Sequence, residues 1–252
     1  MRTSDAASPA VVWHDLECGR YRADLPLWRE LAEEARGDAS SATILDIGAG
    51  TGRVTLDLAR AGHRVTALDI DGGLLSALSE RVRSEAIETV QADARNFELS
   101  CHDYDLCLVP MQTIQLLGDA GERVELFRQA REHLRPGALL AAAIVTELEP
   151  FDSEREGRGP APETVRHGER LYVSRALSVR LDRASVRIER ERSITVDDAA
   201  APPSERNLIM LARVSTSQLR REGTEAGLGY AGTRTIAATD EHVGSTVVML
   251  RA

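Results

Sequence analysis

The sequence predicts an α/β fold: a doubly wound, seven-stranded, mostly parallel sheet with an inserted antiparallel β meander. Three observations support this prediction. Over residues 39–150, short apolar runs typical of strands buried on both faces alternate with segments of helical period. A glycine-rich turn follows the first of these runs. Beyond residue 150, apolar and charged residues alternate with period two, as they do in half-exposed antiparallel strands.

The first strand, turn and helix organise the chain. The apolar run at residues 44–47 ends abruptly at residues 48–52, whose glycines permit positive φ and close approach of a ligand to the backbone. A helical pattern begins at Val54, and a second strand, residues 65–68, ends at Asp69. Such a unit binds a nucleoside, because the turn and the helix N-terminus face a negative group while the acid takes a ribose hydroxyl pair.

The spacing of the glycines narrows the choice of nucleoside. The dinucleotide fingerprint is G-x-G-x-x-G, and its third glycine position holds Arg53 here. Asp46, two residues before the first glycine, is not part of that fingerprint either. The string D-I-G-A-G-T-G resembles the first motif of the class I S-adenosylmethionine (SAM) methyltransferases, and the resemblance covers about residues 40–150. An NAD oxidoreductase remains an alternative, ranked low because of Arg53.

The resemblance implies SAM as the cofactor and a Rossmann-like methyltransferase fold. In that family the glycine turn passes under the methionyl part of SAM, and the acid after the second strand holds the ribose. The next residue packs on the adenine, and an acid after the third strand accepts from the adenine amino group. Carried over to this chain, the cofactor-binding positions are Tyr21, Asp46, Gly48, Ala49, Gly50, Thr51, Gly52, Asp69, Ile70, Asp93, Ala94 and Pro110.

Two of these assignments have a plain structural alternative. Asp93 suits an exocyclic amine, which only an acceptor can satisfy, but an aspartate there could also cap a turn. Tyr21 lies before an expected helix, where small-molecule methyltransferases often carry a lid with a tyrosine that meets the SAM carboxylate or the substrate. A packing tyrosine with a hydrated hydroxyl is an equally good interpretation.

The segment after the fourth strand bears on the substrate. The family places the floor beneath the transferable methyl here, and DNA and RNA amino-methyltransferases carry two prolines and an aromatic residue in it. This chain has V-P-M-Q instead, which resembles the glycine and amino-sugar N-methylating enzymes. Met111, Gln112 and Gln115 are therefore candidate substrate-binding residues, although a glutamine at helical spacing is more often a cap or a surface residue.

His242 is the candidate general base, because its ordinary pKa lies near working pH and its loop falls at the sheet edge that carries the site. A surface histidine is the alternative. Methyl transfer from a sulfonium often needs no base, since alignment of the acceptor lone pair suffices.

Four segments are expected. Residues 1–38 form an N-terminal helical lid, and residues 39–150 form the SAM-binding core. Residues 151–214 form an antiparallel insertion that roofs the substrate pocket or mediates a homodimer. Residues 215–252 add a final helix and a β hairpin that completes the core sheet and supplies the antiparallel seventh strand of the family.

Composition excludes several classes of function. A net charge of −9 and 4% aromatic residues argue against a nucleic-acid partner. The chain has no lysine, so Schiff-base chemistry and a P-loop lysine are excluded. Three cysteines without C-x-x-C spacing and the lack of a signal peptide indicate the cytoplasm. No apolar run reaches membrane length, and the histidines lack metal-ligand spacing.

The sequence therefore predicts a cytoplasmic enzyme that moves a methyl group from SAM to a nitrogen or oxygen of a small metabolite. Three alternatives remain. The first is SAM chemistry without methyl transfer, such as aminocarboxypropyl transfer or cyclisation. The second is a nucleic-acid or protein methyltransferase, and the third is a SAM-binding protein without catalysis.

Overall fold

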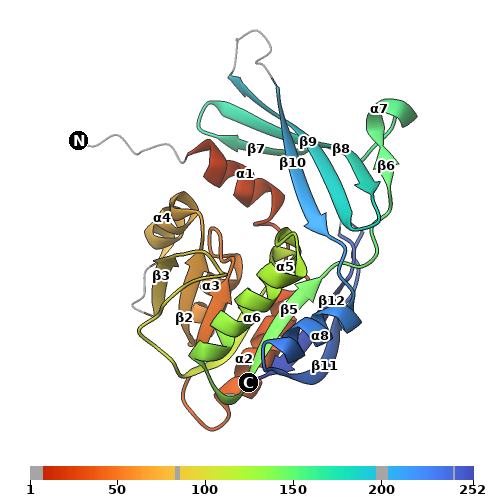
Figure 1. The fold of residues 1–252 in the computed structure, drawn as a ribbon. Coiled ribbons are helices and arrows are strands. Elements are labelled where there is room, and N and C mark those ends of the chain that lie inside the picture. The colour runs from red at the N-terminus through yellow and green to blue at the C-terminus, as the bar shows by residue number, and fades with distance from the viewer. Residues whose placement is uncertain (1–7, 83–85, 197–203, 241) are drawn as a thin grey trace, which may run out of the picture. The chain divides into compact units, whose positions relative to one another are not determined.

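The computed structural model describes residues 8–82, 86–196, 204–240 and 242–252 (Figure 1). The chain forms two compact units. The core unit comprises Tyr21–Glu147 and Ala212–Ala252, and the sheet unit comprises Met1–Arg20 and Leu148–Leu211. The sequence also predicts a turn at residues 197–204 within the antiparallel insertion, and of these only Ser204 lies among the described residues.

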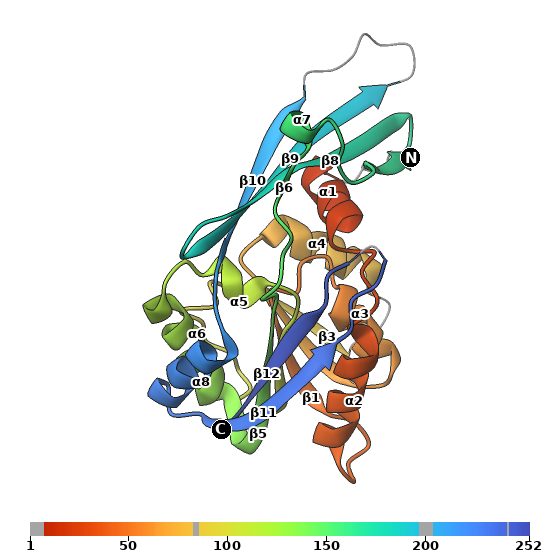
Figure 2. The ribbon, with the colours of Figure 1, turned by 90° about the vertical axis from the view of Figure 1, so that its right-hand side faces the viewer.

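The core unit contains a seven-stranded sheet of order β11-β12-β5-β4-β1-β2-β3. Strands β3, β2, β1, β4 and β5 pair in parallel, and β12 runs antiparallel to both β5 and β11 (Figure 2). The predicted fold class is therefore confirmed, including the antiparallel strand that the C-terminal hairpin supplies. The strands are β1 (Thr43–Ile47), β2 (Arg64–Asp69), β3 (Ile87–Gln91), β4 (Tyr104–Val109), β5 (Leu134–Ile144), β11 (Gly229–Ile236) and β12 (Ser245–Arg251).

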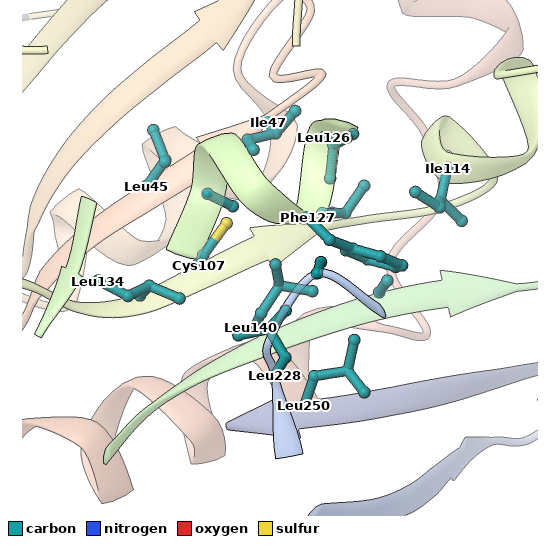
Figure 3. Packing of buried hydrophobic residues seen from close by; sticks show 14 of the residues in the cluster. Leu45, Ile47, Cys107, Ile114, Leu126, Phe127, Leu134, Leu140, Leu228 and Leu250 are labelled. Carbon is teal, nitrogen blue, oxygen red and sulfur yellow. The ribbon is translucent and has the colours of Figure 1, made fainter. Parts of the chain in front are cut away.

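Helices cover both faces of this sheet, because neighbouring side chains of a strand point to opposite faces. Ile44 of β1 shares a buried cluster with Trp28 and Leu58, whereas the next residue, Leu45, shares one with Phe127 (Figure 3). Strands apolar at every position are the sequence signature of this arrangement. The helices of the core unit are α2 (Leu25–Arg36), α3 (Arg53–Arg60), α4 (Gly72–Arg81), α5 (Thr113–Leu116), α6 (Ala120–His133) and α8 (Thr216–Glu225).

The sheet unit contains the antiparallel sheet expected after residue 150, together with α1 from the N-terminal segment. Its strands follow the order β10-β9-β8-β6, and β7 also pairs with β8. Arginines of β9 are paired within the unit: Arg192 with Glu17, and Arg190 with Glu163. The elements are α1 (Pro9–Glu17), β6 (Phe151–Asp152), α7 (Ser153–Glu156), β7 (Glu163–His167), β8 (Arg170–Leu181), β9 (Ser185–Val196) and β10 (Glu205–Ala212).

The N-terminal segment differs from the single helical lid expected over residues 1–38. It forms two helices: α1 belongs to the sheet unit and α2 belongs to the core unit. Trp13 of α1 packs edge-on against Tyr172 of β8, with ring centroids 5.0 Å apart. Trp28 and Leu31 of α2 are fully buried in the core unit. The chain breaks between the helices because their apolar faces bury against different sheets.

Candidate functional site

The glycine turn links β1 to α3 at the carboxyl edge of the core sheet. Gly48, Gly50 and Gly52 all have positive φ, at 76°, 54° and 89°. A Cβ on Gly48 would lie 2.4 Å from Cγ2 of Thr113, and one on Gly52 would lie 2.2 Å from a methyl of Leu78. Glycine is therefore required at both positions by conformation and by space. The turn lies directly against the first residue of α5.

Asp69 ends β2 beside this turn. Its Oδ2 accepts from the backbone N–H of Gly50 at 2.7 Å, and its Oδ1 accepts from that of Asp71 at 2.9 Å. The carboxylate is thus held at the tip of the strand by two backbone donors. Asp69 shapes the turn as well as presenting an acceptor there, a link that the spacing of the sequence did not reveal.

Ile70 and Asp93 occupy the same edge. The Ile70 side chain is 66% exposed, which is unusual for a large apolar residue and leaves an apolar surface open beside Asp69. Asp93 lies two residues beyond Gln91, the β3 partner of Asp69 in the sheet register. The parallel pairing of β2 and β3 therefore brings Ile70 and Asp93 to one side of the turn.

Arg95 holds the Asp93 carboxylate, a contact that sequence reasoning missed. Its Nε lies 2.9 Å from Oδ1, and its Nη2 lies 2.6 Å from Oδ2. The Arg95 backbone N–H also donates to Oδ1, and its Nη1 pairs with Glu122. These hydrogen bonds hold the pKa of Asp93 below its usual range. The carboxylate is ionised and partly engaged before any ligand arrives.

Asp46, the acid before the glycines, is 1% exposed. Its Oδ2 accepts from the Thr55 hydroxyl at 2.6 Å, but its Oδ1 has no partner among the described residues. Burial raises the pKa of Asp46 to about 6, and the nearby charge of Asp69 contributes to the rise. An unpartnered buried acceptor is costly and marks a place that a donor or cation would satisfy.

We expect Asp46 to make the protein less stable as pH rises from about 4 to about 7. The folded state binds the Asp46 proton more tightly than the unfolded chain, so unfolding becomes easier as that proton is lost. The change is about 3 kcal/mol at most, at about 1.4 kcal/mol per pKa unit. Urea unfolding of wild type and Asp46→Asn at several pH values measures the difference.

Asp93→Asn is the matched control, because the lowered pKa of Asp93 stabilises the folded state as pH rises and loses that effect as pH falls. That effect is complete above about pH 4, the ordinary pKa of an aspartate, so the difference between Asp93→Asn and wild type should stay flat between pH 4 and 7. Parallel curves for wild type and Asp46→Asn between pH 4 and 7 would contradict the assignment of a raised pKa to Asp46.

The segment after β4 carries backbone strain. Met111 has φ of +53° and is the one non-glycine residue with positive φ in the part of the chain that the structure describes. Such strain concentrates at functional sites and persists where the surroundings enforce it. Met111 follows Pro110 directly and lies two residues before Thr113, which contacts the glycine turn. Gln112 stands at the start of α5 and makes no capping hydrogen bond with its side chain.

Gln115 has a different role from the substrate contact expected for it. The side chain is 1% exposed, and its Nε2 donates to the carbonyls of Val145 and Ala212 at 3.1 and 3.0 Å. Its Oε1 accepts from the Val145 N–H at 2.8 Å. The expectation was wrong because every polar atom of the amide is used to join three backbone segments.

We expect Met111→Gly to be more stable than Met111→Val by about 1–2 kcal/mol. Left-handed backbone is easy for glycine and worst for a β-branched residue. Met249 of the extended strand β12 is the control, where the order must reverse: valine is tolerated and glycine destabilises. Urea unfolding measures both pairs, and the same order at both positions would contradict strain at Met111.

Two candidates from opposite ends of the chain meet in the core unit. The rings of Tyr21 and His242 lie with their centroids 4.8 Å apart and tilted by 42°. Burial and the charge of Asp24 raise the pKa of Tyr21, which opposes ionisation of its hydroxyl, and a hydrogen bond with Ser245 acts in the other direction. Ser245 begins β12, whose next residue pairs with Ile144 at the carboxyl end of β5. The pair therefore lies at the sheet edge that also carries the glycine turn.

Among the described residues, no group of three or more histidine, cysteine or acidic side chains is arranged to hold a metal ion. No described helix is long and apolar enough to span a membrane.

Comparison with known proteins matches residues 44–137 to the family described as "Methyltransferase domain". The chain is 31% identical over 115 residues to the cypemycin N-terminal methyltransferase of a Streptomyces species, which covers 46% of this chain and 45% of that protein. Across the matched curated relatives, the aligned segment spans 24–58% of the relative's length.

Several solved structures resemble nearly the whole chain, including the following two. One is a sugar N-methyltransferase from a Streptoalloteichus species, with a TM-score of 0.71 and 17% identity over 100% of this chain and 96% of that one. The other is the SAM-bound amino pentose methyltransferase of calicheamicin biosynthesis from Micromonospora echinaspora, with a TM-score of 0.68 and 19% identity over 96% and 97%. At these identities the resemblance establishes a shared fold.

Proposed function

We propose that the chain is a class I SAM-dependent methyltransferase that methylates a nitrogen or oxygen of a small metabolite, and the match of residues 44–137 to the methyltransferase domain family supports this proposal. One observation carries the proposal. The glycine turn is hydrogen-bonded to the acid at the tip of β2, within a seven-stranded sheet whose last strand is antiparallel. This arrangement combines a nucleoside site with the carboxyl edge at which open α/β sheets bind ligands.

SAM fits the residues at this edge. The Asp46 oxygen without a partner is the kind of buried acceptor that a cationic ligand satisfies. Asp69 presents a fixed carboxylate for the ribose hydroxyls. Ile70 offers an exposed apolar side chain for the adenine ring, and Asp93 offers an acceptor for the adenine amino group. When bound, SAM supplies an electrophilic methyl group on a sulfonium. The remaining residues that we propose to line it are Tyr21, Gly48, Ala49, Gly50, Thr51, Gly52, Ala94 and Pro110.

The chain itself would align the acceptor atom with the methyl group of SAM and would exclude water from the site. We assign Met111 and Gln112 to the acceptor side, because the strained backbone after β4 lies beside the glycine turn. Tyr21 keeps its proton and can donate a hydrogen bond, since its pKa is raised. His242, against the Tyr21 ring, is the group that would take a proton from the acceptor nitrogen or oxygen.

A nitrogen is the acceptor that we favour. Three of the similar proteins support this choice: they are named as the cypemycin N-terminal methyltransferase, an amino pentose methyltransferase and a sugar N-methyltransferase. An amine that has lost its proton carries the lone pair that a sulfonium methyl needs, and the imidazole of His242 beside Tyr21 can receive that proton. Oxygen acceptors remain within the proposal, because the same alignment serves a hydroxyl group.

We further propose that the protein acts in the cytoplasm, without nucleic acid or membrane, and can form a homodimer. The net charge of −9 is unfavourable for binding phosphates. β10 is an edge strand of its sheet and exposes Leu208 and Met210, at 54% and 41%, which supports self-association. Light scattering of the purified chain tests the dimer, and Leu208→Glu must dissociate it.

The test of function is calorimetric titration with S-adenosylhomocysteine beside NAD, followed by transfer of labelled methyl from SAM. The acceptor panel contains amino sugars, peptides with a free N-terminus, phenols and RNA. Micromolar binding of S-adenosylhomocysteine and labelling of an amine support the proposal. Binding of NAD alone would indicate an oxidoreductase and contradict the proposal. Labelling of RNA alone would contradict the assignment of a small-molecule substrate.

A further inference from the structure

Arg53 stands where the dinucleotide fingerprint has its third glycine, and its side chain is almost fully buried. It is the first residue of α3, directly after Gly52. The guanidinium forms a bidentate ion pair with Asp24, with Nη2 lying 2.7 Å from Oδ2. The two side chains are 6% and 1% exposed. Asp24 also accepts from the indole N–H of Trp28 at 2.8 Å, which fixes the carboxylate in turn.

The contacts of Arg53 converge on Tyr21. Its Nη1 donates to the Tyr21 carbonyl at 3.0 Å, and its guanidinium lies over the Tyr21 ring at 5.3 Å from the centroid. His242 contacts the same ring. One buried cation therefore fixes the backbone and the ring of Tyr21 together. The backbone of Arg53 directly follows Gly52, the last residue of the glycine turn.

Burial of an arginine–carboxylate pair contributes little net stability, because the desolvation cost offsets the attraction. Its geometry is nevertheless demanding, since the planar guanidinium accepts one orientation of its partner. We propose that Arg53 is a positioning residue that holds Tyr21 against His242 beside the glycine turn. This inference rests on the proposed function for its catalytic meaning, since the pair would face the methyl acceptor.

The test reads the Tyr21–His242 geometry directly. A histidine packed on a tyrosine ring carries a ring-current shift in its imidazole proton resonances. The His242 resonance is assigned by its loss in His242→Gln, and Tyr21→Leu defines the position without stacking. We expect Arg53→Met to move the His242 resonance to the Tyr21→Leu position. Arg53→Met/Asp24→Asn removes the uncompensated buried charge, keeps an acceptor for Trp28, and must show the same displacement.

Arg123→Met is the matched control, because Arg123 forms a second buried bidentate pair, with Glu222, in the same unit. It must lower stability and leave the His242 resonance at the wild-type position. A folded Arg53→Met/Asp24→Asn protein with the wild-type resonance would overturn the inference. S-adenosylhomocysteine titration of wild type separates the two proposals: failure to bind would refute the proposed function and leave the resonance test of Arg53 standing.

Discussion

Asp69→Ala should abolish measurable binding of S-adenosylhomocysteine, weakening it at least a hundredfold, which corresponds to about 2.7 kcal/mol. Two losses combine in this variant. The carboxylate that would accept from the ribose hydroxyls is removed, and the N–H groups of Gly50 and Asp71 lose their acceptor. The turn that would carry the ligand is therefore loosened at the same time. Calorimetric titration of folded variant and wild type measures the effect.

Asp105→Ala is the control for this experiment. Asp105 also accepts from a backbone N–H of β1, that of Thr43 at 2.7 Å, but it does so at the first residue of the strand. The amino and carboxyl ends of parallel strands lie at opposite edges of a sheet, so Asp105 is remote from the glycine turn. We expect it to lose stability and to bind S-adenosylhomocysteine as wild type does. Unchanged binding by Asp69→Ala would refute the nucleoside site.

Glu222→Ala should lower the free energy of unfolding by about 3–5 kcal/mol, the usual effect of leaving a buried charge without its partner. Glu222 of α8 accepts from Arg123 of α6 through two hydrogen bonds of 2.8 and 2.7 Å. Arg123 is 2% exposed, and its guanidinium also donates to the Leu117 carbonyl at 3.0 Å. Its guanidinium would therefore stay buried and charged. Urea unfolding of both proteins gives the difference.

The same two helices supply the control. Arg128 and Glu225 also join α6 to α8, at 3.9 Å, but their side chains are 44% and 66% exposed. Glu225→Ala should change stability by less than about 0.5 kcal/mol, because solvent screens an exposed pair. Replacing both members of the buried pair, in Arg123→Met/Glu222→Leu, should recover most of the loss. Equal losses in Glu222→Ala and Glu225→Ala would show that burial does not determine the effect.

Much of the fold and of the nucleoside site could be predicted from local sequence patterns. The apolar run, the glycines and Asp69 lie within about 25 residues of one another, and each records a property of its own position: burial on both faces, positive φ, or the end of a strand. The period-two alternation likewise predicted the antiparallel insertion. Such signals survive in the sequence because the backbone conformation at a position restricts which residues it accepts.

Pairings between distant side chains were not predictable in this way. Gln115 has the spacing of a helix-surface residue, yet it joins Val145 and Ala212 in the core. Asp93 reads as a ligand-binding acid, yet Arg95 already holds both of its oxygens. Residue type and spacing predict that a polar group needs a hydrogen-bond partner, but they do not identify which group the fold places within hydrogen-bonding distance.

The sequence by itself therefore determined the α/β fold, the glycine turn and the acid at the tip of β2, since each depends on residues close together in the chain. Only the tertiary structure decided that Arg53 binds Asp24, and that Tyr21 meets His242. The physical reason is long-range packing: β12 lies beside β5 in the sheet, and Tyr21 shares one buried cluster with Ile236 and Val247 of the C-terminal hairpin. Burial there then selects the charged and aromatic partners that satisfy one another.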